Sequence, residues 1–169
     1  MTADILIVDD EADIRELVSG ILQDEGYSTR QARDSEEAFQ AIEQRRVLNI
    51  KAAYARAREA ALDPGWTLSI DFMTAVHGLI THDLPHADNR PGLIRDNPKA
   101  RITQVGSPQH GGRYKPPQYG GDIWRLLDAL VTWHGQLTAA GADPLARAPL
   151  VHYHDALIHP CWDGNGRVG

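Results

Sequence analysis

The chain has 169 residues, of which 42% are hydrophobic and 24% are charged, and its 17 basic and 23 acidic side chains give a net charge of −6. This composition is typical of a folded globular protein rather than a disordered one, and the negative charge argues against nucleic acid as the main partner. The single cysteine, Cys161, excludes an intrachain disulfide framework and a cysteine-based zinc site.

The beginning of the sequence gives no sign of targeting to a membrane. The first residues lack the basic segment of a signal peptide, and the apolar run Ile5–Val8 is far too short for a membrane span. The cysteine content does not require an oxidising compartment. We therefore expect a cytoplasmic protein with neither a membrane nor a nucleic acid among its partners.

Residues 1–46 show a strand–helix–strand–helix pattern. The run Ile5–Val8, which is β-branched at three of its four positions, is typical of a buried parallel strand. A helix is expected from Ala12 to Glu25, where apolar residues recur at helical spacing before a glycine. A second short strand is predicted over Tyr27–Ala32, and Asp34–Glu37 supply the cap and the acidic first turn of a second helix.

This stretch resembles the start of a response-regulator receiver domain, from the run L-I-V-D-D-E to the run E-G-Y. The resemblance implies that Asp9 and Asp10 would help to hold Mg²⁺ beside a phospho-acceptor aspartate at the end of a third strand. No such aspartate follows, so we favour a capped strand end with a solvated acidic cluster. We expect residues 1–46 to be an incomplete receiver-like segment that is not phosphorylated.

The second helix is expected to continue beyond this segment. Apolar and alanine positions recur at steps of three and four from Phe39 to Ala61, and Asp63-Pro64-Gly65 ends the pattern. The junction between the receiver-like segment, 1–46, and the second unit, 47–169, is therefore expected inside a helix near Arg46.

Residues 47–169 are predicted to be mainly α-helical with one β-hairpin. An amphipathic helix is expected from about Ser69 to Ile80, followed by a loop over 84–98. Two short strands, 101–105 and 113–115, flank a glycine-rich tip. A helix containing Trp124 and Trp133, a loop over 139–149 and a helix over 150–159 complete the chain.

The last eleven residues place a base, a carboxylate, two glycines and an arginine at spacings suited to the phosphates of a nucleotide. The imidazole of His159 can take a proton at neutral pH, and Asp163 offers a hard oxygen ligand for Mg²⁺. Gly164 and Gly166 allow a tight turn that points backbone N–H groups at an anion. Arg167 would neutralise phosphate charge with a forked donor.

This string resembles the signature of the Fic (Fido) family, H-P-F-x-[DE]-G-N-G-R-x-x-R. The resemblance implies a protein adenylyltransferase, in which His159 deprotonates a Ser, Thr or Tyr hydroxyl of a target protein. The hydroxyl then attacks the α-phosphate of ATP, AMP is transferred and pyrophosphate leaves. By the same resemblance Asp163 is the Mg²⁺ ligand, while Gly164, Asn165, Gly166 and Arg167 bind the nucleotide. The implied fold is a helical domain with a hairpin flap, preceded by the incomplete βαβα segment.

The sequence departs from the signature at two positions. Cys161 stands where the family usually has a phenylalanine that plugs into the core, and the neighbouring Trp162 is expected to compensate. The second arginine of the signature would be residue 170, beyond the sequence. We therefore expect a Fic domain that lacks its C-terminal helices and transfers AMP barely or not at all. The alternative is a signalling or interaction module, or an inactive fragment, derived from a receiver fused to a Fic remnant.

The hairpin also fits the Fic pattern. The resemblance implies a flap, Arg113-Tyr114-Lys115, that holds the target backbone by β-augmentation beside His159, whereas the hairpin alone is equally compatible with an ordinary surface loop. The run Pro91-Gly92-Leu93-Ile94-Arg95 matches the P-G-x-x-R that precedes the flap in the family. The family's inhibitory motif, [ST]-x-x-x-E-[GN], has no match in the sequence, so inhibition would come from a separate partner protein or from a missing C-terminus.

The remaining titratable residues are expected to be structural. His152 and His154 lie two positions apart on a helix and therefore on different faces, which argues against a shared metal ion. The histidines elsewhere in helices and loops, His77 among them, are expected to be hydrogen-bonded or exposed. Asp122 and Asp155 are expected on solvated helix faces.

Overall fold

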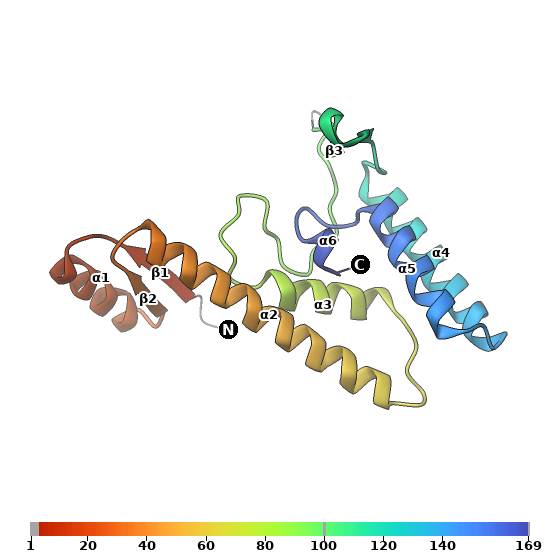
Figure 1. Cartoon of the computed structure of the whole chain (residues 1–169), viewed down its shortest axis with the longest axis horizontal. Coiled ribbons are helices and arrows are strands. Elements are labelled where there is room, and N and C mark those ends of the chain that lie inside the picture. The colour runs from red at the N-terminus through yellow and green to blue at the C-terminus, as the bar shows by residue number, and fades with distance from the viewer. Residues whose placement is uncertain (1–3, 100, 169) are drawn as a thin grey trace.

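The computed structural model describes residues 4–99 and 101–168, which form a mainly helical protein with two small strand pairs, as predicted from the sequence. The molecule is elongated (Figure 1). The helix α1 (Ala12–Asp24) and the strands β1 (Asp4–Val8) and β2 (Ser28–Ala32) lie at one end. The helices α4 (Gly120–Ala139) and α5 (Pro144–Ile158) lie at the other. Within the described ranges, none of the helices has the length and apolar content that a membrane crossing requires.

The N-terminal unit has the predicted strand–helix–strand order. β1 and β2 pair in parallel, with Ile5 opposite Thr29 and Val8 opposite Ala32. The Asp9 carboxylate accepts a hydrogen bond from the backbone N–H of Glu11 at 2.9 Å, which is the capped strand end that we favoured. This unit has little core, because much of the apolar surface of α1 faces solvent.

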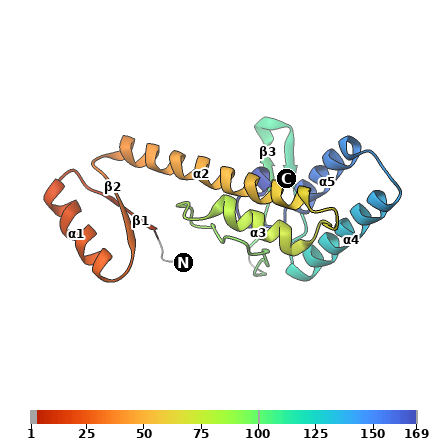
Figure 2. The same ribbon diagram turned by 90° about the horizontal axis from the view of Figure 1, so that it is seen from below.

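The helix α2 (Ser35–Leu62) connects the two ends of the molecule (Figure 1, Figure 2). Asp34 caps it by accepting from the Glu37 N–H at 2.8 Å, and the helix passes residue 46 without a break, as predicted. Its second half packs against α3 (Ile70–Thr81). There the buried Asn49 donates from Nδ2 to the carbonyl of Ile80 at 3.2 Å and to that of His82 at 2.6 Å.

The hydrophobic core lies where α3, α4 and α5 meet. Ile123, Leu127 and Leu130 of α4 and Ile158 of α5 are buried together. Half-buried residues of α3, α4, α5 and the loop after α3 surround them, namely Ile70, Met73, Ile94, Trp133 and Val151. The short helix α6 (Asn165–Val168) packs against α3 and α5, so the core supports the segment that contains the predicted signature.

The prediction of a loop up to Pro149 is wrong, because α5 begins at Pro144. Asp143 caps the helix by accepting from the Leu145 N–H at 2.8 Å, and Pro144 occupies the first turn. Proline is favoured there because its fixed φ suits the helix and the first N–H groups of a helix have no partner within it. Pro149 then lies inside the helix.

The hairpin forms as predicted, but its first strand is shifted. β3 (Val105–Ser107) pairs antiparallel with β4 (Gly112–Tyr114) across a short 3₁₀ turn, Pro108–His110. Residues 101–104 do not join the strand, because they are bonded elsewhere. The Arg101 N–H donates to the Pro98 carbonyl at 2.8 Å, and the Thr103 N–H donates to Gln118 Oε1 at 2.7 Å.

Candidate active site

His159 lies at the C-terminal end of α5, where the chain leaves the helix. Its backbone is in the left-handed region, with φ 50° and ψ 60°, and its N–H donates to the carbonyl of Asp155 at 2.8 Å. A residue other than glycine adopts this conformation rarely, and such residues cluster at functional sites where the surroundings enforce it. The turn at His159 directs residues 160–164 back over α3.

Arg95 enforces this turn. It is completely buried, and its Nε donates to the His159 carbonyl at 2.6 Å, while one guanidinium nitrogen donates to the carbonyls of Ile158, at 3.3 Å, and Pro117. Its backbone N–H donates to the Pro160 carbonyl at 2.8 Å. One arginine thus fixes the chain on both sides of the predicted base. The sequence indicates Arg95 only as the end of P-G-x-x-R and gives no sign of this role.

The protonation state of His159 suits a base. Burial and, to a smaller extent, the charge of Arg95 lower the pKa of its imidazole below 6.5. The ring is therefore predominantly neutral at pH 7, which is the form that accepts a proton.

The loop after His159 is closed by the side chain of Asn165. Its Oδ1 accepts from the Cys161 N–H and its Nδ2 donates to the Cys161 carbonyl, both at 2.8 Å. Asn165 is buried, and its amide is engaged by these two bonds. The side chain therefore closes the loop, and the backbone N–H is a group that this residue can offer to an anion.

A second buried side chain, His77 of α3, supports the loop through hydrogen bonds. Its Nε2 lies 2.8 Å from the Asp163 carbonyl, and its Nδ1 accepts from the Gly92 N–H at 2.9 Å. These two bonds require the neutral tautomer with the proton on Nε2, and burial lowers the pKa of this histidine, which favours the neutral form. The expectation of a hydrogen-bonded histidine is confirmed, whereas its contact with the signature loop could not be seen in the sequence.

Gly164 is required by the close packing of the loop on α3. Its φ is +81°, and a Cβ at this position would lie 2.6 Å from Thr81 Cγ2 and 3.3 Å from His77 Nε2. Only glycine fits such a site without displacement. Gly166 differs, because a Cβ there would meet nothing within 4 Å.

Asp163 and Arg167 form an ion pair with each other, Oδ2 to Nη2, at 2.8 Å. Both side chains are about one-third exposed and so accessible to a ligand. Among the described residues no group of three or more His, Cys, Asp or Glu side chains could hold a metal ion. One carboxylate nevertheless fits Mg²⁺, which usually binds one or two carboxylates together with the phosphates of a substrate.

Cys161 itself fills the buried position of the signature, so the expectation that Trp162 compensates there is wrong. The Cys161 side chain is buried, and its backbone forms an antiparallel bridge to Ile94. Burial raises the pKa of the thiol to about 12, and the nearby Asp155 adds to the shift. Trp162 is half-exposed instead, with the guanidinium groups of Arg90 and Arg101 over its ring at 5.4 and 4.7 Å.

Asp155 is buried, so its predicted solvated position is wrong. It is only 2% exposed, and neither carboxylate oxygen has a hydrogen-bond partner among the described residues. It lies three positions before Ile158 and therefore on the same, core-facing side of α5. Burial raises the pKa of its carboxyl group to about 6. Asp122, in contrast, is exposed as expected and pairs with Arg125 at 3.0 Å.

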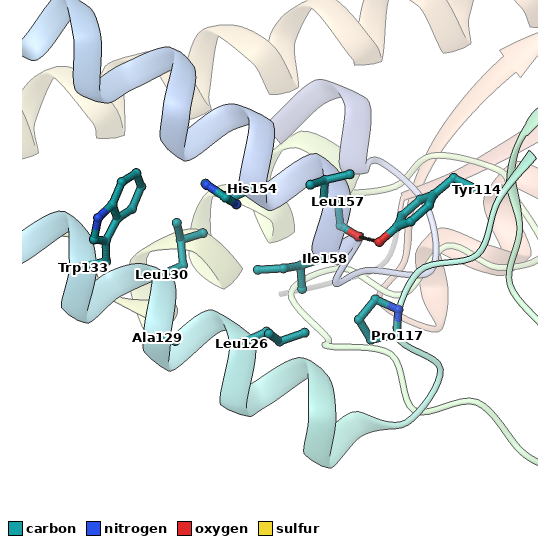
Figure 3. Close-up of a pocket in the computed structure, with 9 residues that line it drawn as sticks. All are labelled: Tyr114, Pro117, Leu126, Ala129, Leu130, Trp133, His154, Leu157 and Ile158. Atoms are coloured by element: carbon teal, nitrogen blue, oxygen red, sulfur yellow. Dashed lines mark hydrogen bonds between the residues drawn. The ribbon is translucent and has the colours of Figure 1, made fainter. Parts of the chain in front are cut away.

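The predicted flap is held against the end of α5. The Tyr114 hydroxyl donates to the Leu157 carbonyl at 3.0 Å, a bond drawn in Figure 3. Arg113 donates to Gln104 Oε1 at 3.2 Å, and Lys115 is exposed. The hairpin is thereby tied two residues before His159. The structure thus brings the flap close to the signature segment.

Comparison with known proteins places this arrangement in a family. A sequence model of the Fic/DOC family matches residues 67–169. The chain is 37% identical over 72 residues to protein adenylyltransferase fic-1 of Caenorhabditis elegans and of Caenorhabditis briggsae, which covers 41% of this chain and 13% of each relative. It is also 63% identical over 46 residues to the nitrogen assimilation regulatory protein NtrX of Azorhizobium caulinodans, 27% of this chain and 10% of that protein. The NtrX match is consistent with a receiver-like start.

Solved structures share the fold. A Fic domain-containing signalling protein from Bacteroides thetaiotaomicron superposes with a TM-score of 0.62 at 22% identity, over 73% of this chain and 44% of that one. Fic-1 from C. elegans superposes with a TM-score of 0.56 at 26% identity, over 75% of this chain and 34% of that one. The chain thus spans less than half the length of each of these proteins.

Proposed function

The chain belongs to the Fic/DOC family, and from this premise we propose that it is a protein adenylyltransferase, which transfers AMP from ATP to a Ser, Thr or Tyr hydroxyl of a target protein. The observation that carries the proposal is the position of His159. A neutral imidazole stands at the start of the loop that contains Asp163, Gly164 and Arg167, and Arg95 fixes its backbone.

In the proposed reaction His159 accepts the proton of the target hydroxyl. The hydroxyl oxygen forms a bond to the α-phosphorus of ATP, and the bond from that phosphorus to the oxygen of the pyrophosphate group breaks. The products are the AMP ester of the target and pyrophosphate. A positioned general base contributes a rate factor of about 10² to 10⁴.

The loop residues would hold the nucleotide. Mg²⁺, when bound, would supply positive charge beside the phosphates, with Asp163 as its protein ligand. Arg167 would bind phosphate oxygens, which requires it to exchange the Asp163 carboxylate for the ligand. The backbone N–H groups from Gly164 to Gly166 lie at the beginning of α6, where the first N–H groups have no partner within the helix.

The hairpin would hold the target. The two-stranded sheet of β3 and β4 has edges at which an extended segment can add by backbone hydrogen bonds. Arg113, Tyr114 and Lys115 are at or beside one such edge, and the Tyr114 bond to Leu157 keeps that edge near His159. We propose a cytoplasmic location, where ATP and target hydroxyls meet, and regulation by a separate inhibitory partner protein.

A second candidate function is a signalling or interaction module, and one observation favours it. The N-terminal unit leaves Leu17 and Ile21 of α1 61% and 57% exposed, on a helix whose apolar face would normally be covered. A partner that covers this face would use the receiver-like segment for recognition.

The proposed activity is tested by the intact mass of candidate target proteins incubated with the chain, ATP and Mg²⁺. We expect a mass increase of one AMP group, its loss in His159→Ala, and its retention in His152→Ala, which removes an exposed histidine from the same helix. An adduct of equal yield in His159→Ala would contradict the assignment of the base. A screen of targets without any adduct would contradict the function and favour the interaction module.

A further inference from the structure

We propose that the groove between α4, α5 and the hairpin binds an acidic segment of the target protein that carries one bulky apolar side chain. This proposal rests on the proposed function, because it names the kind of sequence that would present the hydroxyl to His159. The groove supplies the apolar contact, and the hairpin supplies the charge.

The groove is an apolar hollow large enough for a bulky side chain. It has a volume of about 460 Å³. Figure 3 shows Leu126 and Trp133 of α4 on one side, Leu157 of α5 on the other, and Tyr114 of the hairpin at one end. Leu126 is 38% exposed and Tyr114 is 42% exposed, so both offer apolar area to a ligand. Burial of one large apolar side chain is the main source of affinity that such a hollow provides.

The position of the groove relates it to the proposed chemistry. Leu157 and Ile158 line the groove and directly precede His159 in the chain. The Tyr114 hydroxyl donates to the Leu157 carbonyl, so the hairpin borders both the groove and the end of α5. A segment with one side chain in the groove would therefore have its neighbouring residues beside the edge of β4 and the predicted base.

The charge of the hairpin selects an acidic segment. Residues 97–121 contain four basic residues and no acidic residue, in a chain whose net charge is −6. Arg101 is already paired with Asp88. Arg113 and Lys115, on either side of Tyr114, are exposed and make no ion pair within the described part of the chain. Opposite charge on the bound segment would complement them, and such complementarity mainly determines specificity.

The test uses the full chain, without ATP, and four pools of fluorescein-labelled nonapeptides with a central tyrosine. In each pool the flanking residues are either all glutamate or all lysine. One of them is replaced by tryptophan or by alanine, at each flanking position in turn. Fluorescence anisotropy gives the affinity of each pool. We expect the glutamate–tryptophan pool to bind at least about tenfold more tightly than the lysine–alanine pool, since apolar burial and charge both favour it.

Two pairs of variants separate the two contributions. Ala129→Trp fills the groove from an exposed position of its wall, and Gln136→Trp adds the same side chain at an exposed position of α4 outside the groove. The double change of Arg113→Gln and Lys115→Gln removes the hairpin charge. The double change of Lys51→Gln and Arg58→Gln removes two exposed charges of α2.

We expect Ala129→Trp to abolish the preference for tryptophan and to preserve the preference for glutamate. The hairpin variant should abolish the preference for glutamate and preserve the preference for tryptophan. Neither control should change either preference. Equal affinity of the four pools, or equal effects of the variants and their controls, would overturn the proposal. A dimer in sedimentation that Ala129→Trp dissociates and Gln136→Trp does not would overturn it as well, because a second copy of the chain would then cover the groove. AMP transfer without these preferences would refute this inference alone, whereas the preferences without transfer would refute only the proposed activity.

Discussion

At the level of single residues, the proposed chemistry depends on a neutral His159. The imidazole must be deprotonated to accept a proton, so the rate should fall as the pH drops through its pKa. Burial and the Arg95 charge lower that pKa below 6.5. We therefore predict that kcat/KM for AMP transfer is constant near pH 7 and declines on the acidic side with a midpoint below 6.5. A midpoint above 6.5 in the pH profile would contradict the assigned environment of His159.

Asp155 is a buried carboxylate of α5 whose two oxygens have no hydrogen-bond partner among the described residues. Its pKa is raised in the folded protein, from 3.8 to about 6, so the folded state holds the proton more tightly than the unfolded state. Below pH 3.8 the carboxyl group is neutral in both the folded and the unfolded state, so the full stability is present. The free energy of unfolding then decreases as the pH rises from 3.8 through about 6. At pH 7 the shift corresponds to about 3 kcal/mol, at about 1.4 kcal/mol for each pKa unit.

We predict that Asp155→Asn, which resembles the protonated carboxyl group, raises the free energy of unfolding at pH 7 and leaves it nearly unchanged at pH 4. Urea titrations at the two pH values measure this difference. Asp122→Asn on the exposed face of α4 is the control and should show little change at either pH. If Asp155→Asn were no more stable than the natural chain at pH 7, the carboxylate would have a partner that offsets its burial.

At the level of elements, the signature loop is shaped by its contact with α3. Gly164 has a φ of +81° and approaches Thr81 so closely that an added Cβ would lie 2.6 Å from the Thr81 Cγ2. We predict that Gly164→Ala displaces the loop, lowers stability by about 1–3 kcal/mol and weakens ATP binding. Thermal unfolding and calorimetry measure the two effects.

A second substitution distinguishes the steric contact from the backbone strain. Thr81→Ser removes Cγ2 but keeps the hydroxyl group, which donates to the His77 carbonyl at 2.7 Å. Added to Gly164→Ala, it should restore part of the stability, with the cost of the positive φ remaining. Gly166→Ala is the matched control, because a Cβ there meets open space. Equal losses for the alanine variants at 164 and 166 would show that contact with α3 does not shape the loop.

Local signals predicted α2 correctly, whereas the start of α5 was missed although its signals, the Asp143 cap and Pro144 in the first turn, are also local. The Asp34 cap and the repeating apolar positions predict α2 through residue 46, which is confirmed. The signature gives the order of the site residues, but their roles stay predictions. The supports provided by Arg95 and His77 could not be predicted, because they join residues 64 and 86 positions apart in the chain. The burial of Asp155 was missed because carboxylates are rarely buried without a partner.

At the level of the whole molecule, the core is concentrated on one side of the predicted boundary at residue 46. The buried apolar cluster belongs entirely to α4 and α5. Among residues 4–46 only Ile7 and Ala32 are buried apolar residues. The second half of α2 is tied to α3 through Asn49, three residues beyond the boundary. The boundary itself stays a prediction, although the distribution of burial favours a place near it.

This distribution leads to a prediction about independent folding. Ordering one residue costs about 1–2 kcal/mol of backbone entropy, and a chain of 46 residues with two buried apolar side chains cannot offset that cost. The ion pair between Asp4 and Arg30, at 2.9 Å, adds little, because partly exposed pairs contribute at most about 1 kcal/mol.

We predict that a peptide of residues 1–46 shows no cooperative thermal transition by circular dichroism. Residues 47–169 alone should keep one, with a midpoint close to that of the full chain, because their core and the Asn49 bonds remain. A cooperative transition in the short peptide would show that the receiver-like segment is an independent unit, and its absence from residues 47–169 would show that the N-terminal unit is part of the same folding unit.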